Sequence, residues 1–132
     1  MSVANVGLIQ RGYDLWNSGQ MEALKVMCAP DLVMSTPPDW PDAITSSSRD
    51  EAFARLVENR SLFESDTLVP EQWIEAGDCV IVPTQWFAVP KGASAEVKVL
   101  LVPVFTIRGE NIVRLDWYGS VEQAIEAVGL EP

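Results

Sequence analysis

The stretch from residue 95 to residue 130 constrains the fold of this chain more than any other part. A long apolar run covers residues 97–107, turn-forming residues follow at 108–111, and a second β-rich run covers residues 112–118. This pattern predicts two antiparallel strands, followed by a short helix. The unbroken apolar run is typical of a central strand that is covered on both faces. Because proline cannot donate to a sheet ladder, Pro103 predicts a bulge or a sharp bend within this strand.

The first part of the chain predicts two helices and a strand. Apolar residues recur at spacings of three and four from Val6 to Trp16, which predicts a helix over about residues 2–17, ended by Gly19. A second apolar stripe, Met21, Leu24, Met27 and Cys28, predicts a short helix that ends at Pro30. The apolar residues 32–34 then predict the first strand.

The middle of the chain predicts a third helix and a strand pair. Ser48 and Glu51 form a capping-box sequence, so a helix is expected to begin there. Its expected buried face consists of Phe53, Leu56, Val57 and Phe63. Strands are predicted over residues 67–76 and 79–89, joined by a turn at Gly77 and Asp78.

Taken together, the element order predicts one α+β domain over residues 1–132. The expected architecture is a cone: a strongly bent, mostly antiparallel sheet is wrapped around the N-terminal helices and encloses an apolar pocket. A chain of 132 residues is long enough to bury such a core in one domain.

Composition excludes several classes of partner. The chain carries 19 acidic and 9 basic residues, a formal net charge of −10, so nucleic acid and anionic membranes would be repelled. No apolar run approaches the roughly 20 residues that span a bilayer, and the N-terminus has no signal-peptide pattern. We therefore expect a cytoplasmic protein with no nucleic-acid or membrane partner. Its cysteines, Cys28 and Cys79, are expected to be free buried thiols.

The absence of histidine restricts the chemistry most sharply. With no histidine in the chain, catalytic systems built on Ser-His-Asp or Cys-His and histidine-containing metal sites are excluded. Nucleotide-binding glycine motifs are also absent. We expect no cofactor and no metal, so any acid-base step would depend on Asp, Glu, Tyr, Lys or Cys.

Three local phrases resemble the SnoaL-like branch of the nuclear transport factor 2-like superfamily. They are residues 13–19 (YDLWNSG), residues 29–33 (APDLV), and residues 105–107 with 112–115 (FTI and IVRL). The resemblance implies a cystatin-like α+β barrel of the kind seen in ketosteroid isomerase and polyketide cyclases. It also implies that several catalytic positions of those enzymes are changed here, because they correspond to Thr36, Pro103, Trp117 and Ser120.

Strand alternation and the resemblance together predict the lining of the pocket. Val113, Leu115 and Trp117 are expected to point inward from the last strand, with Thr84 and Trp86 facing the same interior. The candidate ligand-binding residues are Trp16, Trp40, Thr84, Trp86, Pro103, Leu115 and Trp117. Plain core packing is the alternative for Trp16, Trp86 and Trp117.

Two residues are candidates for catalysis. Asp39 lies beside Trp40 in the proline-rich segment 36–48 and could serve as a general base, while Tyr13 could donate a hydrogen bond to a substrate oxygen. The alternatives are a solvated turn aspartate and a core tyrosine. Two functions therefore remain open: a cofactor-independent isomerase or cyclase-like enzyme acting on a hydrophobic cyclic molecule, or a non-catalytic module that binds such a molecule or a partner chain.

A homodimer through the outer face of the sheet is the expected assembly. Leu100, Val102 and Val104 alternate on that face and would leave an apolar stripe in water. Trp73, between Glu71 and Glu75, is a second candidate for the interface.

Overall fold

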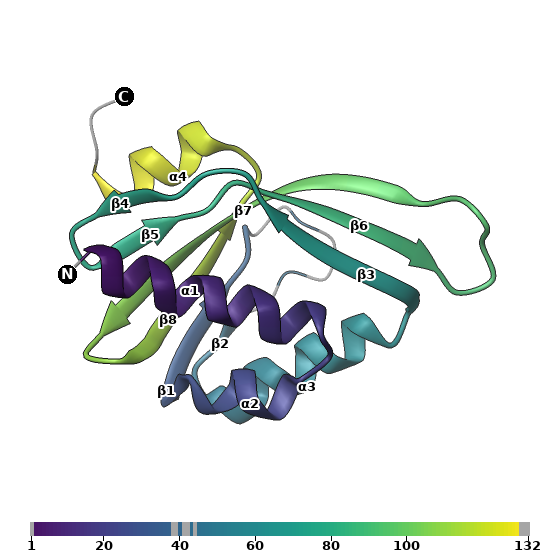
Figure 1. Cartoon of the computed structure of the whole chain (residues 1–132), viewed down its shortest axis with the longest axis horizontal. Helices are drawn as coiled ribbons and strands as arrows, with labels where there is room; N and C mark the ends of the chain where they lie inside the picture. Colours follow the sequence, from purple (N-terminus) through teal and green to yellow (C-terminus); the bar gives the residue numbers. More distant parts are fainter. Residues whose placement is uncertain (1, 38–39, 41–42, 44, 130–132) are drawn as a thin grey trace.

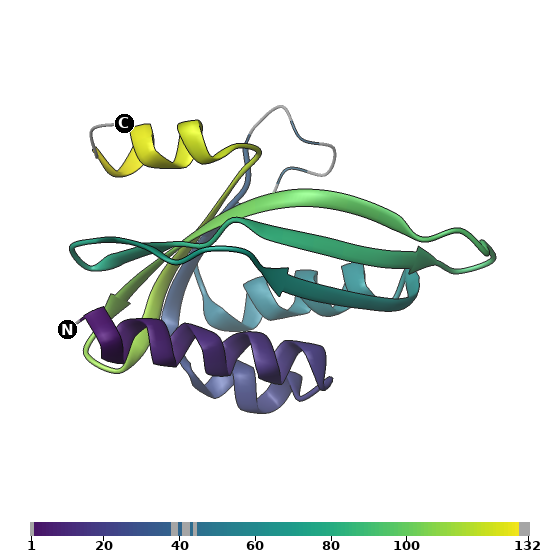
Figure 2. The same cartoon turned by 45° about the horizontal axis from the view of Figure 1, so that its top comes forward.

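A computed structural model describes residues 2–37, 40, 43 and 45–129 of the chain. It consists of a strongly bent sheet that does not close, with helices on both sides of it (Figures 1 and 2). The elements are α1 (Ser2–Asn17), α2 (Met21–Val26), β1 (Cys28–Ser35), β2 (Thr45–Ser46), α3 (Arg49–Arg60), β3 (Phe63–Pro70), β4 (Ile74–Ala76), β5 (Cys79–Ile81), β6 (Thr84–Pro90), β7 (Val97–Arg108), β8 (Asn111–Tyr118) and α4 (Val121–Val128). The predicted α+β cone is confirmed.

The sheet is built around the long strand β7. One side of β7 pairs with β8 over most of its length, and β8 pairs in parallel with β1. The other side pairs with β6 through Val97–Leu101 and then with β5 through Val104–Thr106. In Figure 2, α1, α2 and α3 lie on the concave side of the sheet and α4 lies on the opposite side. The concave side is therefore where an enclosed site can form.

Pro103 marks the point where β7 changes partner, and the predicted bulge does not lie there. The ladder with β8 continues through Pro103, which pairs with Trp117. The Pro103 carbonyl accepts a hydrogen bond of 3.1 Å from the amide of Val82, between β5 and β6. The register shift lies further along, where Thr106 and Ile107 face Arg114 and Ile112, so that Val113 is the extra residue.

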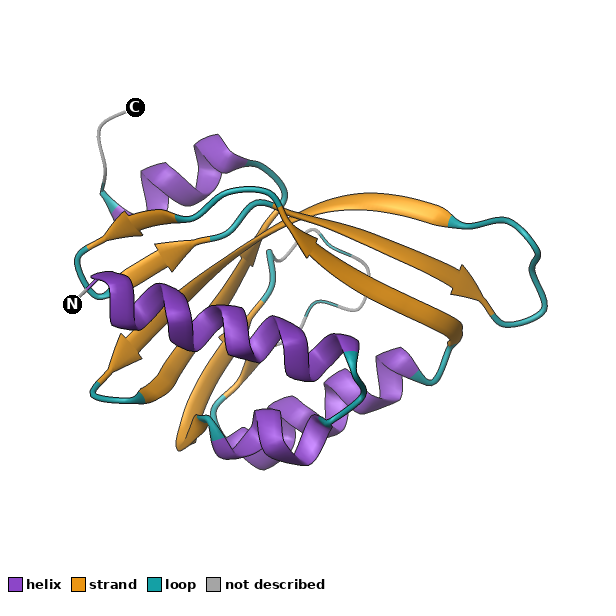
Figure 3. Ribbon diagram, in the orientation of Figure 1, coloured by secondary structure: helices purple, strands orange, loops and turns teal. Residues whose placement is uncertain are grey.

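Two predicted strands are each broken into two. Residues 71–73 separate β3 from β4, and residues 82–83 separate β5 from β6 (Figure 3). The two breaks lie opposite each other, because the amide of Glu71 donates to the carbonyl of Pro83 at 2.8 Å. The hairpin therefore bends as a unit, and β3 and β6 continue together beside the first half of β7.

The helices partly follow the predictions. α1 has the predicted bounds, and the Ser48 hydroxyl accepts from the Glu51 amide at 3.1 Å as the cap of α3. The predicted buried face of α3 is wrong at its end, because Val57 is 50% exposed and Phe63 begins β3. The second helix ends at Val26, and Pro30 lies exposed within β1 instead of ending that helix.

The core is divided between the two faces of the sheet. The larger part lies on the concave side, where Ile9, Leu32, Met34 and Phe53 pack. On the convex side, Val102 and Val104 are 0% and 2% exposed beneath Ala124 and its neighbours in α4. The predicted exposed stripe of Leu100, Val102 and Val104 is therefore wrong for the two valines. Among the described residues, no helix is long and apolar enough to cross a membrane.

Candidate binding cavity

A cavity of about 540 Å³ lies between the concave face of the sheet and helices α1 and α3. Its walls come from segments far apart in the sequence, including the end of α1, the last turns of α3, and strands β3, β6, β7 and β8. Four of the five tryptophans of the chain line it: Trp16, Trp40, Trp86 and Trp117. These four side chains therefore border one cavity.

A second, much smaller cavity adjoins the first. It measures about 60 Å³, has almost entirely apolar walls, and shares Trp16, Leu56, Leu68 and Trp117 with the large cavity. Leu115 lines it, as the inward orientation of the last strand predicts. Val113 was expected to point the same way, but Ile112 lines this cavity instead, because the extra residue at Val113 shifts the alternation.

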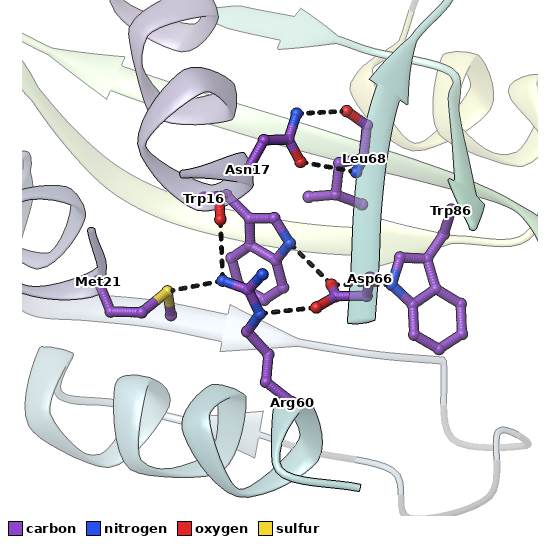
Figure 4. A network of polar contacts seen from close by, with 7 residues as sticks. All are labelled: Trp16, Asn17, Met21, Arg60, Asp66, Leu68 and Trp86. Atoms are coloured by element: carbon purple, nitrogen blue, oxygen red, sulfur yellow. Dashed lines mark hydrogen bonds and ion pairs between the residues drawn. The ribbon is translucent and has the colours of Figure 1, made fainter. Parts of the chain in front are cut away.

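One wall of the large cavity carries a polar network centred on Asp66 (Figure 4). Its carboxylate accepts hydrogen bonds from Arg60 Nε at 2.8 Å, from Trp16 Nε1 at 2.9 Å and from Trp86 Nε1 at 3.2 Å. The Asp66 side chain is only 5% exposed. Three donors therefore replace the hydrogen bonds to water that the carboxylate loses on burial.

Arg60 connects this network to the helices. Its Nη1 donates to the backbone carbonyl of Trp16 at 2.9 Å and contacts Met21 Sδ at 3.4 Å. Its guanidinium carbon lies 4.2 Å from the centre of the Trp16 ring, within cation–π range. The end of α1, the end of α3 and strand β3 are thereby held together at the cavity wall.

Asn17 fixes the same corner to the backbone. Its side-chain amide donates to the carbonyl of Leu68 at 2.8 Å and its side-chain oxygen accepts from the Leu68 amide at 2.9 Å (Figure 4). Among the described strands, β3 pairs only with β6, and Asn17 bonds to the backbone at the other edge of β3. The end of α1 is thus fixed to β3 both by Asn17 and by the Trp16 indole.

Tyr13 lies deeper, in the core beside the small cavity. Its hydroxyl lies 2.6 Å from Thr84 Oγ1, and Thr84 in turn donates to the Val82 carbonyl at 2.7 Å. Tyr13 is therefore the donor in the first of these bonds. Burial raises the pKa of Tyr13 above its ordinary range. Its proton is already engaged, and the predicted donation to a substrate would require that bond to break.

Trp73 packs against Tyr13 as well, with ring centroids 5.8 Å apart and an edge-to-face geometry. The prediction that Trp73 faces outward is therefore wrong. The reason is the break between β3 and β4: Trp73 lies in the connecting segment, where strict strand alternation does not apply.

The other predicted residues are distributed between wall, core and the undescribed segment. Trp40 lines the large cavity, and its indole lies 4.0 Å from the position that a Cβ on Gly119 would take. Thr84 and Pro103 are buried but line neither of the two cavities. Asp39, the candidate base, lies outside the described residues, so its role stays a prediction.

Asp66, Arg60 and Asn17 were not predicted from the sequence. A signal for Asp66 exists: it stands two residues before the core residue Leu68 in a strand, so both point inward. Within the described part of the chain, no three His, Cys, Asp or Glu side chains gather as metal ligands.

Comparison with known proteins identifies the family. The SnoaL-like domain matches residues 9–115. The chain belongs to the SnoaL-like family. No curated protein matches its sequence.

Solved structures show the same nuclear transport factor 2-like fold for this SnoaL-like protein. A protein of unknown function from Burkholderia pseudomallei K96243 is 16% identical, covers 96% of this chain and 98% of its own, with a TM-score of 0.78. TerC, co-crystallized with polyporic acid, is 17% identical; the match covers 95% of this chain and 98% of TerC, with a TM-score of 0.77. A third match is a protein with a ketosteroid isomerase-like fold from Catenulispora acidiphila DSM 44928, in complex with trimethylamine. It is 19% identical, and the match covers 94% of this chain and 93% of that protein, with a TM-score of 0.75.

Proposed function

We propose that this SnoaL-like protein binds a small hydrophobic ring compound in the large cavity. The observation that carries the proposal is the set of four indole rings around a cavity of about 540 Å³. Pockets for small molecules typically measure about 300–1,000 Å³ and have apolar, aromatic walls with few polar groups. That TerC, which shares the fold, was co-crystallized with polyporic acid supports the same proposal.

The geometry favours binding over catalysis. Asp66 is the carboxylate that lines the large cavity among the described residues, and three donors already occupy its oxygens. The Tyr13 proton is directed to Thr84. Both groups are therefore arranged to hold the walls in place and not to move a proton at a ligand.

The catalytic alternative depends on Asp39. In that case Asp39 acts as the general base on a hydrophobic cyclic substrate, and replacing it with asparagine would abolish turnover while leaving ligand affinity unchanged. If the parent converts a ring compound and the Asp39→Asn variant converts it at the same rate, this alternative is excluded.

A calorimetric titration with 2-naphthol tests the binding proposal. The parent protein should bind it saturably at one site. Val99 lines the cavity, so Val99→Trp should fill part of it and weaken binding at least about tenfold. Leu100 is exposed on the opposite face of the same strand, so Leu100→Trp is the matched control and should bind like the parent. Absence of saturable binding, or equal effects of the two variants, would contradict the proposal.

We also propose that two copies associate through the outer face of β3, β6 and β7. Val69, Gln85 and Leu100 form one outward row across these strands, and the two apolar members are 42% and 38% exposed. Phe87 and Lys98 form the next row, with the Lys98 amine 5.8 Å from the ring centre. Apolar rows of this kind on a sheet face are typical of surfaces that bind a partner.

A further inference from the structure

The side-chain nitrogens of Arg60 are not all used within the protein. Nε donates to Asp66, and Nη1 donates to the Trp16 carbonyl and to Met21 Sδ. Within residues 2–37, 40, 43 and 45–129, no hydrogen bond involves Nη2. Nη2 is also not among the buried polar atoms that lack a partner, so space accessible to solvent reaches it. Arg60 is one of the residues that line the large cavity, so this unused donor group belongs to a residue of the cavity wall.

Arg60 is also held rigidly. Three separate groups contact its guanidinium: the Asp66 carboxylate from β3, and the Trp16 carbonyl and the Trp16 ring from α1. A guanidinium fixed in this way loses little further side-chain freedom when it donates to a ligand. Its free donor therefore has a defined direction before any ligand binds.

The charge around Arg60 indicates what kind of acceptor it suits. The ion pair of Arg60 and Asp66, 2.8 Å apart, is neutral as a whole, and the chain carries a net charge of −10. An anionic ligand would find no excess positive charge at this wall and would be repelled by the molecule as a whole. A neutral oxygen acceptor, such as a ketone carbonyl with two lone pairs, matches the N–H donors that remain on Nη2.

We infer that Arg60 Nη2 donates a hydrogen bond to the ligand and selects neutral ring compounds that carry a carbonyl oxygen. This inference rests on the proposed function, since it assigns the polar end of the ligand while the tryptophans hold its ring. Arg60 is thus a specificity-determining residue, and Asp66 is the residue that positions it. Lysine could pair with Asp66 but has one nitrogen, which cannot serve Asp66, the Trp16 carbonyl and a ligand together.

The test compares 1-tetralone with tetralin, two ring compounds that differ in the carbonyl group. Calorimetry gives the ratio of the tetralin Kd to the 1-tetralone Kd for the parent, for Arg60→Lys and for Arg55→Lys. Arg55 is an exposed arginine of the same helix and supplies the matched control. The ratio should fall about tenfold in Arg60→Lys, as expected when a charge-assisted hydrogen bond is lost, and should stay at the parent value in Arg55→Lys.

A second measurement needs no variant. The carbonyl carbon of ¹³C-labelled 1-tetralone bound to the parent should resonate downfield of its position in cyclohexane, because a hydrogen bond to a cation polarises the carbonyl. A bound resonance at the cyclohexane position would overturn the inference even where Arg60→Lys does not fold.

The outcomes separate the inference from the proposed function. If both compounds bind but the Kd ratio is the same in the parent and Arg60→Lys, the role of Arg60 is refuted while the cavity remains a binding site. If neither compound binds the folded parent, both the proposed function and the inference fail.

Discussion

The two halves of β7 are similarly apolar in sequence but lie in opposite environments. In the first half, Val97, Val99 and Leu100 are 38%, 42% and 38% exposed, whereas Val102 and Val104 in the second half are 0% and 2% exposed. The second half lies between α4 on one face and the concave core on the other. In the first half, the inward side borders the large cavity, and none of the described elements covers the outward side. An apolar run therefore predicts a strand, but its neighbours decide whether it is buried.

The two halves are also stabilised differently. Apolar packing beneath α4 holds the second half, whereas the network of Asp66, Arg60 and Trp16 holds the elements that face the first half. The large cavity lies beside the first half of β7, where Val99 and Leu101 line it.

The largest expected effect is at Asp66. Asp66→Ala leaves Arg60 and two indole N–H groups without their acceptor, and breaking a buried ion pair costs about 3–5 kcal/mol. The Arg60 side chain is 20% exposed and can recover some hydration, so we expect a loss near the low end, about 3 kcal/mol in the free energy of unfolding. Urea denaturation measures it. Asp66→Asn keeps an acceptor oxygen and should lose less stability. A loss below about 1 kcal/mol for Asp66→Ala would show that the network does not stabilise the elements that face the first half of β7.

The next effect compares one valine from each half of β7. Val104→Ala removes buried methyl groups and should lower the free energy of unfolding by about 2 kcal/mol. Val99→Ala makes the same chemical change on a half-exposed side chain at the cavity and should change it by less than about 0.5 kcal/mol. Urea denaturation of both variants measures the difference. Equal losses would mean that both halves are packed alike, against the contrast drawn above.

Stability should fall at alkaline pH, because two ionisable groups are buried on the concave side. Burial raises the pKa of Cys28 from 9.0 to about 11, with Arg49 opposing the shift, and it raises the pKa of Tyr13 above its ordinary value of 10.0. The unfolded chain releases these protons at lower pH than the folded chain does. Their contribution is therefore complete below about pH 9 and is lost as pH rises, first through Cys28 and then above pH 10 through Tyr13.

Denaturation curves between pH 8 and pH 11 measure this loss. We expect the stability of the parent to fall above pH 9, and a double variant Cys28→Ala with Tyr13→Phe to fall less steeply, by up to about 1.4 kcal/mol per pH unit for each proton removed. Identical slopes in the two proteins would indicate that neither group is buried as described.

The smallest effect on stability is expected at Leu100. Leu100→Asp places a charge on the uncovered outer face and should change the stability of a single copy by less than about 0.5 kcal/mol. If two copies associate through this face, sedimentation should show a dimer for the parent and a monomer for the variant. A parent protein that is monomeric at micromolar concentration would refute the proposed dimer.

Much of the fold could be predicted from local patterns. The bounds of α1, the Ser48 cap and the inward orientation of Trp86 and Trp117 depend on spacing along one element, which the sequence displays directly. The breaks at residues 71–73 and 82–83 could not be predicted, because each depends on the other across the hairpin.

The site was predicted less completely, for a similar reason. Trp16 and Asp66 are 50 residues apart, and Trp86 reaches the same carboxylate from a third element. An acidic residue in a strand is usually solvated, so only its inward position beside Leu68 distinguishes Asp66. Likewise, α4 was predicted as a helix, but not as the cover of Val102 and Val104, although Ala124 and Ile125 form part of an apolar stripe at helical spacing.

The most direct test of the binding proposal uses the five indole N–H signals of the protein in a ¹⁵N–¹H correlation spectrum. Trp16, Trp40, Trp86 and Trp117 line the large cavity, whereas Trp73 packs against Tyr13 and lines neither of the two cavities. During titration with 1-tetralone, the four cavity signals should shift saturably with a single Kd, while the Trp73 signal stays in place. No saturable shift, or a shift of Trp73 as large as those of the other four, would contradict the assignment of this cavity as the binding site.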